Sequence, residues 1–158
     1  MRLALVVPGG LLSLLAVSLV SVNAQAAEVA NLVLDGEEYA LEMEVCDFSG
    51  DADDRYQTLV ARADTDRGPL RVFASRNEVA GMLTHSISAQ FGDFRAGGEV
   101  LEANRTRMGG QWISVAGGAS EPLIRIDGGE LHAEGRFVDT GMTTEPVDGR
   151  LTASCDRR

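Results

Sequence analysis

Residues 83–91, LTHSISAQF, give the clearest indication of the fold. Its odd-numbered residues are apolar apart from His85, and its even-numbered residues are all polar. This period of two is the pattern of a β-strand that buries one face. We therefore expect a strand here, with His85 facing the sheet interior or its rim and mostly neutral, because burial disfavours the charged form.

Similar alternation, punctuated by turn signals such as Asp35-Gly36 and Asp127-Gly128-Gly129, extends in both directions from this stretch. Strands are expected at residues 29–34, 39–46, 70–74, 111–116, 123–127, 130–138 and 147–155. In the second of these, Val45 is expected to face the same side as Tyr39, Leu41 and Met43. Residues 56–63 and 76–82 lack clean alternation and remain either strand or helical turn. About eight or nine strands predict an all-β, mainly antiparallel fold, a small β-sandwich or a barrel-like domain.

The N-terminal residues have the pattern of a secretory signal. Arg2 precedes an apolar run over residues 3–22, and Ala24-Gln25-Ala26 offers a small-x-small cleavage site. We expect a signal peptide at residues 1–26 and a single β domain at 27–158, with no membrane span after cleavage. The alternative is an anchor that is retained, since the run is just long enough to cross a bilayer.

Two cysteines, Cys46 and Cys155, end the second and the last of the expected strands. Exported proteins fold where disulfides survive, so we expect these two residues to be bonded and to close the domain. The absence of a C-x-x-C motif argues against a redox enzyme. The predicted location is the bacterial periplasm or the exterior.

The charge of the chain excludes some partners. It is acidic, with a formal net charge of −10, and its basic residues are all arginine. Phosphates would be repelled, so nucleic acid is not expected as a partner, and neither is an anionic lipid surface.

Neither a metal site nor a catalytic site is specified by a motif. Acidic residues crowd the loop 47–54, but their spacing does not match an EF-hand. His132 and Glu134 lie one pleat apart and lack a third ligand. No nucleophile elbow accompanies either histidine. We expect no cofactor, no metal and no catalytic residue.

Trp112, the only tryptophan, lies between two glycine pairs, on the strand face opposite Ile113. An outward aromatic side chain there is a candidate contact for a partner. The alternative is that the ring covers a second sheet or a sheet edge.

Three short stretches resemble the mycobacterial lipoprotein antigen family. They are Leu32–Gly36 followed by Met43–Cys46, then Glu130–Val138, and finally Leu151–Cys155. The lipid-attachment cysteine and the Ser/Thr-rich tether of that family are missing here. The resemblance implies a disulfide-closed β domain without catalytic residues.

These observations favour a non-enzymatic envelope or binding module that meets an unknown protein or small ligand in the cell envelope. The alternatives are a periplasmic inhibitor or small-ligand carrier and, behind these, a small hydrolase. A protruding loop would indicate an inhibitor, a closed apolar pocket a carrier, and a histidine beside a nucleophile a hydrolase.

Overall fold

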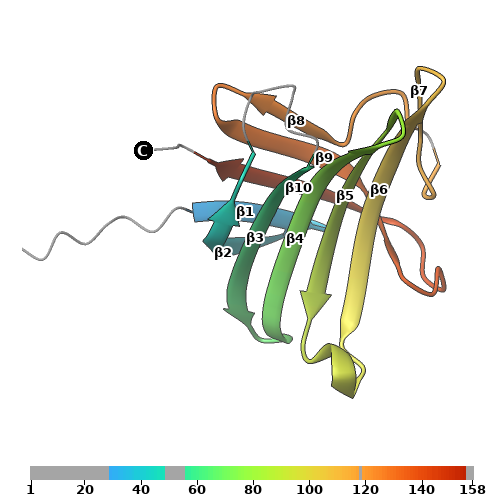
Figure 1. The fold of residues 1–158 in the computed structure, drawn as a ribbon. Coiled ribbons are helices and arrows are strands. Elements are labelled where there is room, and N and C mark those ends of the chain that lie inside the picture. The colour runs from blue at the N-terminus through green and yellow to red at the C-terminus, as the bar shows by residue number, and fades with distance from the viewer. Residues whose placement is uncertain (1–28, 49–55, 118, 156–158) are drawn as a thin grey trace, which may run out of the picture.

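A computed structural model describes residues 29–48, 56–117 and 119–155. Within them the chain forms ten strands and one short 3-10 turn, η1 (Phe94–Ala96) (Figure 1). The strands are β1 (Val29–Leu34), β2 (Glu37–Cys46), β3 (Tyr56–Thr65), β4 (Gly68–Val79), β5 (Met82–Phe91), β6 (Glu99–Met108), β7 (Gln111–Ile113), β8 (Ile124–Asp127), β9 (Glu130–Asp139) and β10 (Val147–Ser154).

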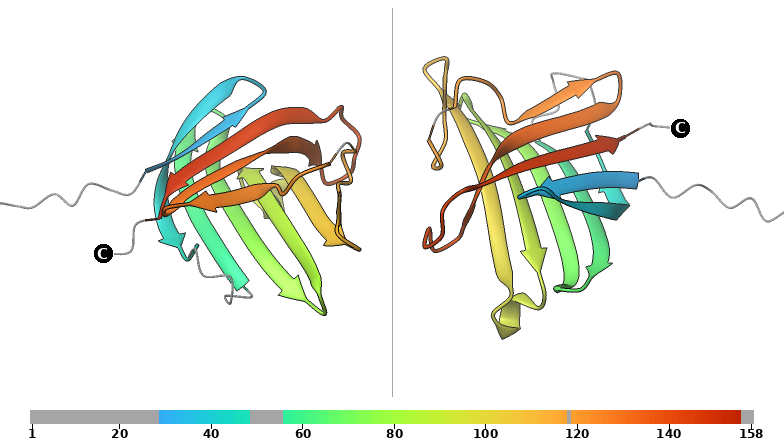
Figure 2. Two further views of the ribbon diagram at one scale, coloured as in Figure 1. Left: turned by 90° about the horizontal axis from the view of Figure 1, so that it is seen from above. Right: turned by 180° about the vertical axis from the view of Figure 1, so that it is seen from behind.

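The sheet is antiparallel and closes into a barrel. Neighbours follow the order β7-β6-β5-β4-β3-β2-β1-β10-β9-β8, and β6 also pairs with β9. Eight strands therefore form the closed wall, and β7 and β8 are additions to it. Figure 2, seen from behind, shows β10 between β1 and β9. The expected all-β antiparallel fold is confirmed, and it is a barrel with extra strands.

Alternation along each strand determines what fills the barrel. On β5 the side chains of the odd-numbered residues point inward, as expected, and His85 is only 3% exposed. Small and large apolar side chains from all eight wall strands pack together in the interior. At the end of the barrel where β5 finishes, Arg67 lies over the Phe91 ring, 3.9 Å from its centroid, and Tyr39 meets that ring edge-on.

The structure decides two open segments and corrects two of the strand expectations. Residues 56–63, which were open between strand and helical turn, lie in β3. Residues 76–82 cover the end of β4, the turn at Ala80 and Gly81, and the first residue of β5. β6 is a ten-residue strand that the alternation did not predict. β7 ends at Ile113, whereas a strand was expected up to residue 116.

A β-bulge in β2 overturns the expected orientation of Val45. The register against β3 shifts between Met43 and Val45, so that Val45 is 45% exposed instead of facing inward. A bulge inserts one extra residue and reverses the alternation after it. As a result Cys46, which strict alternation would point outward, is partly buried and reaches Cys155.

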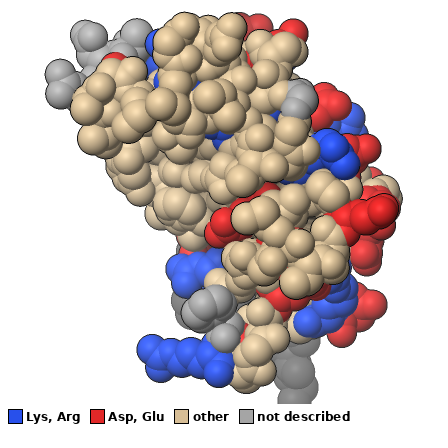
Figure 3. Space-filling model, turned by 90° about the vertical axis from the view of Figure 1, so that its right-hand side faces the viewer, with Lys and Arg blue, Asp and Glu red and all other residues tan. Residues whose placement is uncertain are grey.

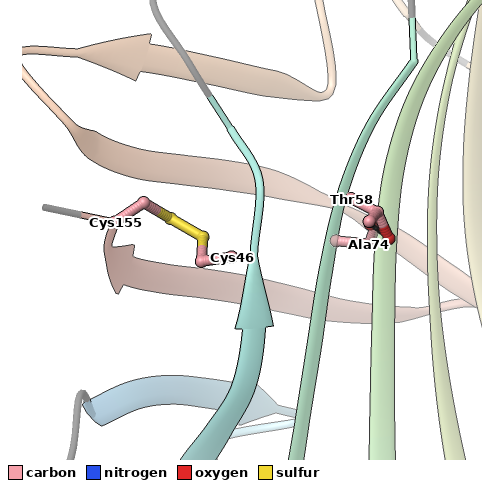
Figure 4. Close-up of a disulfide and its surroundings, with 4 residues drawn as sticks. All are labelled: Cys46, Thr58, Ala74 and Cys155. Atoms are coloured by element: carbon pink, nitrogen blue, oxygen red, sulfur yellow. Dashed lines mark hydrogen bonds between the residues drawn. A yellow bond between two sulfur atoms is a disulfide. The ribbon is translucent and has the colours of Figure 1, made fainter. Parts of the chain in front are cut away.

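The expected disulfide between Cys46 and Cys155 is confirmed (Figure 4). The two Cα atoms are 5.5 Å apart, and the bond joins the end of β2 to the residue after β10. Nearby, the Thr58 hydroxyl donates a hydrogen bond to the Ala74 carbonyl across β3 and β4. The bond spans 109 residues of sequence and ties the first half of the barrel to its last strand.

One glycine lets an aromatic side chain enter the core. A Cβ atom on Gly149 of β10 would lie 2.4 Å from the Phe137 ring and 2.7 Å from Leu34. Phe137 is fully buried, so the ring occupies the space that a side chain at position 149 would need.

Two expectations concern residues outside the described ranges. They are the signal peptide at 1–26 and the acidic residues of loop 47–54 other than Asp47. In the described part, no helix has the length and apolar character needed to cross a membrane.

Candidate functional site

The barrel wall is incomplete where β6 and β9 diverge. These strands pair only through Leu101–Asp139 and Glu102–Val138, near one end of β6. Further along, the segment that precedes β8 enters the gap, and Leu123 becomes 1% exposed. Gly135 on β9 provides the space for the Leu123 side chain, because a Cβ atom at position 135 would lie 2.5 Å from it.

His85 holds β8 in place from inside the barrel. Its Nδ1 accepts a hydrogen bond of 3.1 Å from the Ile124 backbone N–H. The hydrogen of the neutral ring is therefore on Nε2, which has no hydrogen-bond partner among the described residues. Burial, followed by the positive charges of Arg76, Arg107 and Arg105, lowers the pKa of His85 from 6.5 to about 4.

Arg105, on β6, clamps the same gap. Its guanidinium donates hydrogen bonds to the carbonyls of Glu121 (3.0 Å), Pro122 (3.2 Å) and Glu134 (3.0 Å). Burial, then repulsion from Arg125, lowers its pKa. The side chain is held in one orientation, with its charge facing three neutral carbonyls.

Trp112 lies against His85 at this end of the barrel. The two ring centroids are 4.8 Å apart, and the indole is half-buried. The guanidinium carbon of Arg107 is 6.0 Å from the indole centroid. The Trp112 ring therefore covers this end of the barrel. The more exposed side chains in this region belong to other residues of the β4–β5 and β6–β7 hairpins and to the segment after β7.

These side chains form an exposed apolar cluster, which we call the hairpin patch. It consists of Val79 (57% exposed), Met82 (43%), Met108 (52%), Ile113 (55%) and Val115 (63%). Val79 pairs with Met82, and the pairing of Leu83 with Arg107 brings Met82 beside Met108. Residues 108–120 contain no charged side chain. Figure 3 shows a broad area on this side of the molecule that is largely free of charge.

A second feature is a hollow between the segment before β8 and the outer face of β9, β10 and β1. Its volume is about 600 Å³. Its charged and polar lining comprises Arg105, Arg125, Arg136, Arg150, His132, Ser120, Glu121, Glu134 and Asp148. We call it the arginine hollow. Arg125 pairs with Glu121, and Arg136 donates to the Ala116 carbonyl at 3.3 Å.

The other residues named from the sequence are placed as follows. His132 and Glu134 point outward from β9, and both line the hollow. In the described part of the chain no three His, Cys, Asp or Glu side chains are grouped as metal ligands. Within the same ranges, neither histidine is hydrogen-bonded to a serine, threonine or cysteine side chain.

Sequence reasoning missed the arginines of the hollow and the apolar residues of the patch. The uncharged run 108–120 was a visible signal for the patch. For the hollow no local signal exists, because its arginines come from β6, β8, β9 and β10.

No family model, curated protein or solved structure matches the chain. The class of the protein is therefore given by its fold alone, an antiparallel β-barrel closed by a disulfide. Disulfides persist in oxidising compartments, so the bond indicates a location outside the cytoplasm.

Proposed function

We propose that this protein is a non-enzymatic binding module of the bacterial cell envelope, periplasmic or secreted, that meets a partner protein through the hairpin patch. The observation that carries this proposal is the exposed apolar cluster itself. Contiguous apolar side chains on a monomer surface mark interaction sites more often than scattered ones do.

The surroundings of the patch favour association. The chain as a whole has a net charge of −10, yet residues 108–120 have no charge. A partner approaching this side avoids most of the repulsion that an acidic surface would exert on another acidic protein. Trp112 packs on His85 behind the patch and supports the β6–β7 hairpin, so little order has to be gained on binding.

The position of His85 supports a role for this residue without catalysis. A general base must reach the proton that it removes. The Nδ1 atom of His85 is already occupied by the Ile124 N–H, and the ring is buried under Trp112. For His85, the small-hydrolase alternative therefore lacks a hydrogen-bonded nucleophile among the described residues.

The inhibitor alternative rests on one specific observation. In Figure 1 the β6–β7 hairpin extends past the neighbouring strands at one end of the barrel. An extended, uncharged hairpin is the type of element that can enter the cleft of a target. For the carrier alternative, core side chains pack together in the barrel interior, and the arginine hollow at the surface offers a cavity of about 600 Å³.

Site-directed crosslinking tests the proposal. A photoreactive group placed at Ile113 should yield an adduct with a discrete envelope protein, and the same group at Val29, which is 60% exposed and distant in the sheet order, should not. Val115→Asp should abolish the adduct, whereas Val29→Asp is a control of matched exposure and should preserve it. Equal labelling from both positions, or an adduct insensitive to Val115→Asp, would contradict the proposal.

A further inference from the structure

The arginine hollow gathers four arginines and three carboxylates, so its charged lining is slightly positive although the chain as a whole is acidic. Acidic residues outnumber basic ones in this chain, 24 to 14. Nevertheless, Arg105, Arg136 and Arg150 form no ion pair with a described carboxylate, although ion pairs occur elsewhere on the barrel. Three guanidinium groups without an ion-pair partner therefore line one cavity.

The register of β9 and β10 brings two of these arginines toward each other. Arg136 lies opposite Asp148, and Arg150 lies opposite Glu134. Arg136 and Arg150 are consequently diagonal neighbours on the same outer face, a relation that spans about 7–8 Å and is within reach of long side chains. Both can converge on one anionic group.

The third arginine is held in position before any ligand arrives. Arg105 is fixed by its hydrogen bonds to three carbonyls, and Arg136 is tied to Ala116. Side chains that are already ordered lose less entropy when a ligand binds. A guanidinium also offers paired N–H groups that match the geometry of a carboxylate or phosphate.

Carboxylates beside these arginines indicate which other groups a ligand of the hollow would carry. Glu121 is occupied by Arg125, whereas Glu134 and Asp148 lie on the hollow's β-sheet wall next to Arg136 and Arg150. Ionised carboxylates are acceptors only, so they suit hydroxyl donors. A ligand with one anionic group and several hydroxyls would satisfy both kinds of side chain.

We propose that the arginine hollow binds a hydroxylated organic anion, a sugar acid or a sugar phosphate. Arg136 and Arg150 hold the anionic group, Glu134 and Asp148 accept hydrogen bonds from hydroxyls, and Arg105 contributes positive charge from the inner end. The volume of about 600 Å³ falls within the range of small-molecule sites. Its residues differ from those of the hairpin patch, although Arg136 also bonds the Ala116 carbonyl beside Val115. The proposal does not depend on the function proposed for the patch.

Titration of the full folded chain, followed by NMR of its backbone amides, tests the proposal. Glucuronate and glucose 6-phosphate are the two probes, with glucose as the uncharged comparison and inorganic phosphate as the anion without hydroxyls. At about 10 mM even a site with a Kd near 1 mM is mostly occupied. We expect saturable shifts at Gly135 and Gly149, which line the hollow, with at least one of the two probes.

The comparison of probes and variants decides the outcome. The more tightly bound of the two probes shows whether a carboxylate or a phosphate is preferred. Arg136→Gln/Arg150→Gln should weaken binding about 10-fold or more, while Arg62→Gln/Arg71→Gln, which changes the net charge equally on β3 and β4, should not. The proposal is overturned if neither probe shifts these glycines, if glucose or inorganic phosphate binds as tightly as the probes, or if both double variants behave alike.

Discussion

Replacement of His85 by glutamine should remove a specific part of the pH dependence of stability. The ring is 3% exposed, and its pKa is lowered from 6.5 to about 4, chiefly by burial and then by Arg76, Arg107 and Arg105. Glutamine retains an acceptor oxygen for the Ile124 N–H and does not titrate. The variant therefore isolates the protonation of His85 from its hydrogen bond.

The sign and the size follow from proton linkage. Between pH 6.5 and about 4 the unfolded chain binds a proton at His85 and the folded chain does not, so the free energy of unfolding falls as the pH falls through this window. The gap corresponds to about 3 kcal/mol, because each pKa unit is worth about 1.4 kcal/mol. Above pH 6.5 the stabilisation from keeping His85 neutral is fully present.

Urea denaturation at a series of pH values from about 7.5 to about 4 measures this effect. Carboxylates titrate in the same way in both proteins, so the difference in unfolding free energy between wild type and His85→Gln should decline by about 3 kcal/mol across the window. His132→Gln, at an exposed position on β9, is the comparison for a His-to-Gln change outside the core. A constant difference between wild type and His85→Gln across this range would refute the reasoning.

Two further predictions concern the closure of the barrel and its core. The double variant Cys46→Ala/Cys155→Ala should lose about 4–5 kcal/mol of unfolding free energy, since the bond closes a loop of about 100 residues. Thiol labelling of the unfolded wild type should find no free thiol, and two free thiols would exclude the bond. Gly149→Ala should lower the free energy of unfolding by about 1–3 kcal/mol because the new Cβ overlaps the Phe137 ring. In a Phe137→Leu background, Gly149→Ala should lower the free energy of unfolding by much less than it does in the wild type. An equal decrease in both backgrounds would contradict the overlap.

Features that depend on near neighbours along the chain could be predicted from the amino-acid sequence. Alternation over residues 83–91 predicted both the strand β5 and the inward position of His85. With only two cysteines, an expected export signal was enough to predict the pairing of Cys46 with Cys155. These inferences succeed because the pleat of a strand repeats every two residues, and because two cysteines allow a single intramolecular pair.

The closure of the barrel and the composition of its surface depend on contacts between distant segments and became visible in the folded structure. The contact of β6 with β9 joins residues far apart in sequence, and no local pattern predicts which strands become partners. The bulge that exposes Val45 is likewise a matter of register against β3. Arg105, Arg136 and Arg150 come from three different strands, and they line one hollow because the closed sheet and the segment before β8 bring them together. The period of two determines which face of a strand is buried, and so restricts its register. It does not determine which distant strand becomes the partner or where a bulge interrupts the pairing.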